Sequence, residues 1–100
     1  MDTEIKLKDL RRAIDAAIDH LIEDLGIEKV TINEREDLYW DVSAPALYDT
    51  SKRPPTLETG RLTDDIGFVK PIQRGQNADV SYNLVHVAPL LRYIGEKVKR

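Results

Sequence analysis

Residues 4–25 of this chain read EIKLKDLRRAIDAAIDHLIEDL and carry the clearest structural pattern in the sequence. Their apolar side chains recur at three- and four-residue intervals, which is the spacing of one face of an α-helix. These apolar residues are Leu7, Leu10, Ile14, Ala17, Ile18, Leu21 and Leu25. Thr3 is placed to cap the start of the helix, and Gly26 is a typical residue for its end. The pattern predicts one long N-terminal helix over residues 4–25.

The periodicity changes after this helix. Residues 27–32 alternate apolar and polar side chains and are rich in β-branched types, as in a half-buried strand. Residues 37–42, which include Tyr39 and Trp40, form a second candidate strand, and residues 33–36 between the two are typical of a turn. We therefore expect residues 27–32 and 37–42 to form a short β-hairpin.

Residues 43–60 are expected to form an irregular but ordered loop. Pro45, Pro54, Pro55 and Gly60 interrupt this stretch. Tandem prolines enforce an extended backbone and disfavour a helix.

Two helices are predicted in the C-terminal part. Thr63, Asp64 and Asp65 are typical of a helix start, because a capping hydroxyl is followed by two acids near the positive helix end. Gly67 and Pro71 should keep this helix short. Its core-facing side chains are expected to be Leu62, Ile66 and Val69.

The last segment has helical spacing up to the C-terminal residues. Asp79 or Ser81 is placed to cap it, and Pro89 predicts either a kink or a helix that begins near Ala88. The apolar residues at helical spacing are Leu84, Val87, Leu91, Ile94 and Val98. The predicted fold is a single domain over residues 1–100 of the mainly helical α+β class. It has a long N-terminal helix, a short β-hairpin, a proline-bearing loop and two C-terminal helices.

Composition limits the class of protein. The chain has 100 residues, of which 41% are hydrophobic and 33% charged, as in a globular domain. It contains no cysteine, which excludes disulfides, thiolate metal sites and cysteine nucleophiles. Its apolar runs are far shorter than the roughly 20 residues that span a bilayer, and its first residues are acidic. We expect a cytoplasmic protein without a membrane segment.

The net charge of -3 hides an asymmetry between two parts of the chain. Residues 1–41 carry twelve acids and six bases, a balance of -6, whereas residues 42–100 carry six acids and nine bases, a balance of +3. Such an asymmetry suits contacts between copies of the chain or with another protein. The simpler alternative is an ordinary charged surface.

One group of side chains in the N-terminal helix resembles a metal site. Asp15, Asp19 and Glu23 lie at i, i+4 and i+8, and His20 and Asp24 are also one turn apart. Carboxylates and an imidazole on one helix can converge on an ion. The sequence lacks the second Glu-x-x-His helix of a di-iron bundle, and these residues lie opposite the apolar face. A solvated helix face is the preferred interpretation, and no metal or cofactor is expected.

Three further residues could take part in acid–base chemistry. Asp64 and Asp65 could act as a carboxylate pair for acid–base work or for binding magnesium. Adjacent residues on a helix point about 100° apart, however, and capping explains the two acids more simply. His86 could act as a general base only beside a nucleophile or substrate, and no serine or threonine motif indicates one. We predict no catalytic residue.

The basic C-terminal residues suggest a different function. Arg92, Lys97, Lys99 and Arg100 form a small positive patch, which is the basis for an alternative function as a nucleic-acid-associated regulator. The overall negative charge disfavours nucleic acid as a partner.

The large aromatic side chains are concentrated in one stretch. Tyr39, Trp40 and Tyr48, together with Arg53 and Pro55, have the residue types found in protein-interaction hot spots. For Trp40 itself the preferred interpretation is the centre of a small core, and both interpretations can hold for different rings. We predict that these five residues contribute to an interaction surface.

A combination of short motifs resembles a family of small bacterial proteins with no assigned activity. The motifs are an aromatic–Trp strand, a Tyr-Asp step, a proline and a Gly-x-Leu-x-Asp-Asp helix start. They lie at residues 37–42, residues 47–49, Pro54 or Pro55, and residues 60–65. Ile66 stands where an aromatic residue often follows in that family. The resemblance implies a bacterial source and transfers no catalytic residue.

The sequence therefore favours a non-enzymatic protein-interaction module, an accessory or regulatory subunit of a bacterial complex. It would dock on another protein or on a second copy of itself. The nucleic-acid-associated regulator is the alternative, and an enzyme using Asp64, Asp65 or His86 is a third hypothesis.

Overall fold

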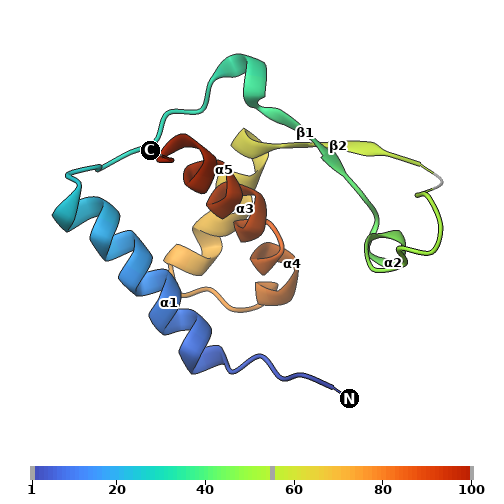
Figure 1. Cartoon of the computed structure of the whole chain (residues 1–100), viewed down its shortest axis with the longest axis horizontal. Coiled ribbons are helices and arrows are strands. Elements are labelled where there is room, and N and C mark those ends of the chain that lie inside the picture. The colour runs from blue at the N-terminus through green and yellow to red at the C-terminus, as the bar shows by residue number, and fades with distance from the viewer. Residues whose placement is uncertain (1, 55, 100) are drawn as a thin grey trace. The chain divides into compact units, whose positions relative to one another are not determined.

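The structure is a computed structural model that describes residues 2–54 and 56–99 (Figure 1). Its contacts divide the chain into two compact units, Met1–Val30 and Thr31–Arg100. The predicted mainly helical α+β class is confirmed, while a single domain over the whole chain stays a prediction. None of the described helices is both long and apolar enough to cross a membrane.

The first unit is one helical segment. The α-helix α1 (Leu7–Asp19) continues directly into the π-helical turn η1 (His20–Asp24). The chain then leaves the helix through Gly26, whose φ of 68° is left-handed, and the N–H of Ile27 donates to the carbonyl of Leu21 at 2.8 Å. The predicted helix is confirmed over residues 7–24, and its glycine stop is confirmed as well.

The predicted first turn of this helix is not formed. Lys6, and not Thr3, occupies the cap position, and its backbone is still extended. Ile5 in the predicted first turn is 77% exposed, so no packing stabilises helical backbone there.

The second unit begins with a 3-10 turn, η2 (Glu34–Glu36), followed by strand β1 (Leu38–Asp41). A four-residue helix, α2 (Ala44–Leu47), follows β1 with Pro45 in its first turn. Strand β2 (Glu58–Arg61) then returns antiparallel to β1. Figure 1 shows the two strands extending from the region of α3 to α2.

The predicted partner of β1 was wrong. Residues 27–32 form no strand, and β1 pairs instead with residues 58–61 from the end of the predicted loop. The register sets Leu38 opposite Arg61. Just beyond this pair, the backbone N–H of Leu62 donates to the carbonyl of Asp37 at 2.8 Å, which ties the start of the next helix to the start of β1. This long-range anchoring brings the two strands together.

Helix α3 (Leu62–Gln73) follows β2 without a linker and is longer than predicted. Gly67 does not interrupt it, and Pro71 lies in its last turn, where only two helical residues follow. The predicted Thr63 cap was also wrong, because its hydroxyl donates to the Asp37 carboxylate at 2.9 Å. The same carboxylate accepts the backbone N–H of Thr63 at 2.8 Å and so caps α3 from outside the helix.

The last segment forms two helices, α4 (Val80–Leu84) and α5 (Val87–Lys97). Asp79 stands at the cap position of α4 without a side-chain hydrogen bond. Helix α5 begins at Val87 with Pro89 in its first turn, in agreement with the predicted start near Ala88. Helix α3 packs on α4, α5 and β2.

The interior of this unit is small and partly polar. Among the described residues, Leu62 is the one buried apolar side chain, at 3% exposed. Two polar side chains, Asp65 and Asn83, are also buried, at 2% and 6% exposed. Trp40 is 71% exposed, so the preferred prediction that it forms the centre of a small core is wrong.

Candidate functional site

A buried carboxylate joins three elements of the second unit. Asp65, one turn into α3, accepts a hydrogen bond from the hydroxyl of Tyr39 on β1 at 2.7 Å. Its other oxygen lies 2.5 Å from Nδ1 of His86, which caps α5. A carboxylate oxygen of this pair accepts, so Nδ1 of His86 carries the hydrogen of the contact. We call these three residues the Asp65 cluster.

Two aromatic rings enclose the imidazole of the Asp65 cluster. Phe68 of α3 stacks on His86 with ring centres 4.2 Å apart and planes inclined by 20°. Tyr82 of α4 approaches both rings edge-on, at 5.3 Å from His86 and 5.5 Å from Phe68. These contacts hold the imidazole in one orientation, and they link α3, α4 and α5.

An open pocket of about 270 Å³ lies beside the Asp65 cluster, between the strands and α3. Its lining includes the three cluster residues together with Asp41 and Asp64. An imidazole held by a buried carboxylate is an arrangement suited to proton transfer. Among the described residues, the imidazole hydrogen-bonds with Asp65 and with no nucleophile. The observed contacts of the Asp65 cluster are those of a structural link between β1, α3 and α5.

Burial and the hydrogen bond to Asp65 raise the pKa of Tyr39 above the ordinary tyrosine value. The folded state therefore favours the neutral phenol. This stabilisation is present below the ordinary tyrosine pKa of about 10 and is lost as the pH rises through the higher folded-state value.

An alkaline titration tests this link. In a titration followed by phenolate absorbance, we expect one tyrosine to ionise later than a free tyrosine, and Tyr39→Phe to remove that late component. The unfolded protein in urea is the control, because its tyrosines should titrate together near pH 10. A late component that persists in Tyr39→Phe would assign the raised pKa to another residue.

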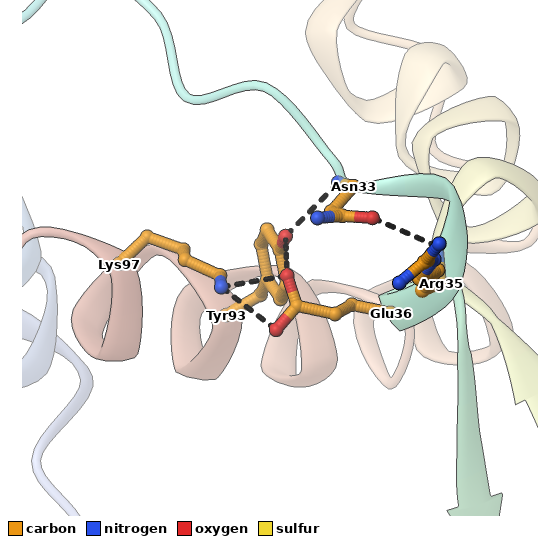
Figure 2. Close-up of polar contacts among 5 residues, drawn as sticks. All are labelled: Asn33, Arg35, Glu36, Tyr93 and Lys97. Carbon is orange, nitrogen blue, oxygen red and sulfur yellow. Dashed lines mark hydrogen bonds and ion pairs between the residues drawn. The ribbon is translucent and has the colours of Figure 1, made fainter.

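A second polar network joins the start of this unit to α5, and Figure 2 shows its side chains. Glu36 accepts from the hydroxyl of Tyr93 at 3.0 Å and from the ammonium of Lys97 at 2.7 Å. The Tyr93 hydroxyl in turn accepts from the backbone N–H of Asn33 at 3.1 Å. The hydrogen bond from Lys97 lowers the pKa of Glu36 most, and the one from Tyr93 lowers it further. The contact with Glu36 in turn raises the pKa of Lys97. Both charges are exposed, so the pair contributes little stability and orients the segment before β1.

The basic C-terminal patch is partly neutralised within the chain. Lys97 pairs with Glu36, and Lys99 lies 3.5 Å from Glu96. Arg100 lies outside the described residues.

The predicted interaction residues occupy different environments. Tyr48 is 83% exposed, and Trp40 and Arg53 are also exposed. Tyr39 is only partly exposed, and its hydroxyl is used by Asp65. Pro55 lies outside the described residues.

The acidic residues of the N-terminal helix remain on its surface. His20 Nδ1 lies 2.6 Å from the Asp24 carboxylate, and both side chains are exposed. In residues 2–54 and 56–99, no three histidine, aspartate or glutamate side chains come together in a way that could hold a metal ion.

Sequence reasoning assigned Asp65 to helix capping and so missed the Asp65 cluster. Asp65 is separated from Tyr39 by 26 residues and from His86 by 21. The available signal was His86 within the apolar run of residues 84–87. That signal does not specify a contact with Asp65.

Comparisons with known proteins gave no match to a family model, to a curated protein or to a solved structure. The resemblance to a family of small bacterial proteins stays an expectation from the sequence motifs.

Proposed function

We propose that this protein is a non-enzymatic interaction module, an accessory or regulatory subunit that docks on a protein partner. The docking surface is the hairpin arm, defined as residues 38–61 with β1, α2 and β2. The observation that carries this proposal is the concentration of exposed apolar side chains on the arm. They are Leu38 at 55% exposed, Trp40 at 71%, Leu47 at 51%, Tyr48 at 83% and Leu57 at 53%.

The exposed surface area is larger than expected for compact units of this size, which supports the binding of a partner. The chain exposes 8930 Å². Compact units of 30 and 70 residues, counted separately, would together expose roughly 6,800 Å². A standard protein interface removes about 800 Å² from each partner, so the excess is of the size that two or three interfaces remove from one chain.

The geometry of the arm also suits docking. Alternation along β1 puts Leu38 and Trp40 on one face, while Tyr39 on the other face is held by Asp65. The base of the arm is thus fixed to α3 through Tyr39, while Trp40 and Tyr48 remain exposed. Each strand of a two-stranded sheet also has one open edge, which can pair with an extended segment of a partner.

Alanine substitutions at Trp40 and Tyr48 test this function. The tagged chain is purified from its native cells, the stoichiometric partner is identified by mass spectrometry, and its affinity is then measured. Trp40→Ala and Tyr48→Ala should each weaken binding about 30-fold or more, as expected for interface hot spots. Because both side chains are exposed, the free energy of unfolding should change by no more than about 0.5 kcal/mol.

Leu84→Ala is the matched control, because Leu84 is 58% exposed but lies on α4, outside the arm. It should leave the affinity unchanged. Equal loss of affinity in all three variants, or unfolding of the Trp40 and Tyr48 variants, would contradict the proposal.

A further inference from the structure

The N-terminal helix carries an apolar face that no other described element of its own unit covers. We call this face the α1 stripe; it consists of Leu7, Leu10, Ile14, Ala17, Ile18, Leu21 and Leu25. No residue of α1 or η1 is buried. Leu7 is 77% exposed and Leu10 is 49% exposed. A helix of this length is marginal in water without tertiary contacts, so its ordered state calls for a covering surface.

The charges of the same segment indicate what covers it. Residues 6–12 contain four bases and one acid, a balance of +3, whereas residues 13–25 contain four acids and no lysine or arginine, a balance of -4. Two such helices in parallel would set like charges side by side. In antiparallel orientation, the basic half of each helix lies beside the acidic half of the other.

Side-chain sizes fit the antiparallel arrangement as well. A pair centred between Asp15 and Ala16 sets Leu10 level with Leu21 of the other copy, and Ile14 level with Ala17. A large side chain then meets a small one near the centre, which allows the helices to approach closely. Along the same pair, basic Lys8, Arg11 and Arg12 are level with Glu23, His20 and Asp19 of the other copy.

We propose that α1 is a self-association surface, through which two copies of this chain pair antiparallel along the α1 stripe. The isologous contact closes on itself and gives a dimer. It is separate from the hairpin arm, and it therefore holds or fails independently of the proposed function.

Absolute mass by light scattering, measured over a range of concentrations, tests the association. We expect the wild-type chain to be a dimer and Ile14→Asp to be a monomer. In the dimer, the introduced charge would be buried at the centre of the α1 stripe. Ala16→Asp is the matched control: it adds the same charge in the same turn but on the exposed opposite side, and it should remain a dimer. Trp40→Ala should also remain a dimer, because it changes only the arm.

Crosslinking tests the orientation, since the described chain has no cysteine of its own. In the antiparallel pair the two Ala17 positions are about 4.5 Å apart along the axis and the two Leu7 positions about 25 Å, at a rise of 1.5 Å per residue. Under mild oxidation, Ala17→Cys should form a covalent dimer and Leu7→Cys should not.

Efficient crosslinking of both variants would show parallel helices and overturn the proposal. A wild-type monomer at all concentrations would also overturn it. In that case, unfolding of Ile14→Asp would show that the α1 stripe is covered within its own chain.

Discussion

Replacing Asp65 with alanine is expected to lower the free energy of unfolding by about 3 kcal/mol. The carboxylate is 2% exposed and accepts hydrogen bonds from Tyr39 and His86. Hydrogen bonds to a charged group contribute about 1.5–3 kcal/mol each, and the substitution leaves both donors partly buried without an acceptor. Because Leu62 is the one described apolar side chain that is buried, little packing offsets this loss.

Urea denaturation followed by circular dichroism measures this loss. Asp64→Ala is the matched control, since Asp64 is adjacent and exposed, and it should change stability by no more than about 0.5 kcal/mol. The loss of stability in Asp65→Asn should lie between those of Asp65→Ala and Asp64→Ala, because the asparagine amide oxygen still accepts a hydrogen bond from the Tyr39 hydroxyl. Equal effects of Asp65→Ala and Asp64→Ala would show that the cluster does not stabilise the fold.

Replacing Gly60 with alanine is expected to cost about 2 kcal/mol, the second largest effect. Gly60 stands opposite Tyr39 in the β1–β2 register, and the aromatic ring lies directly over it. A Cβ at this position would overlap the end of the Tyr39 ring. The ring would have to move, and its hydrogen bond to the carboxylate of Asp65 would be lost or weakened.

Two comparisons make the Gly60 prediction specific. Gly67→Ala, within α3 and with no atom within 4 Å of the added methyl, should stabilise the protein by about 0.5–1 kcal/mol. In a Tyr39→Ala background the cost of Gly60→Ala should largely disappear, because the ring is absent. Loss of stability at Gly60 in both backgrounds would point to strand geometry as the cause.

Asp65→Ala and Gly60→Ala both disrupt the same series of contacts. Gly60 leaves room for the end of the Tyr39 ring. Tyr39 reaches Asp65, which in turn holds His86 at the start of α5. Loss of this link should loosen the base of the hairpin arm. Under the proposed function, partner affinity should then fall together with stability in these variants.

The helices with strong periodicity were predictable from the sequence. Residues 7–24 alternate apolar and charged side chains at helical spacing, and Gly26 supplies the left-handed residue that ends the segment. Helix α5 follows from the same spacing and from a proline in its first turn. Strand β1 was predictable from its aromatic residues.

The partner of β1 was not predictable by the same reasoning. Residues 58–61 are Glu-Thr-Gly-Arg and carry no apolar alternation, because Gly60 must lie beneath the ring of Tyr39. Their strand conformation follows from pairing with β1 and from the anchoring of α3 on Asp37. Residues 27–32 have strand propensity but no such anchor.

By itself the sequence determined the local elements: which segments are helical, where the first helix ends, and which strand is aromatic. Local propensity and side-chain periodicity depend on neighbours within a few residues, so they can be read directly. The tertiary structure decided the pairing of β1, the burial of Asp65 and the exposure of Trp40. Each of these depends on contacts between residues that are distant in the chain, and such contacts are selected by the free energy of the whole fold.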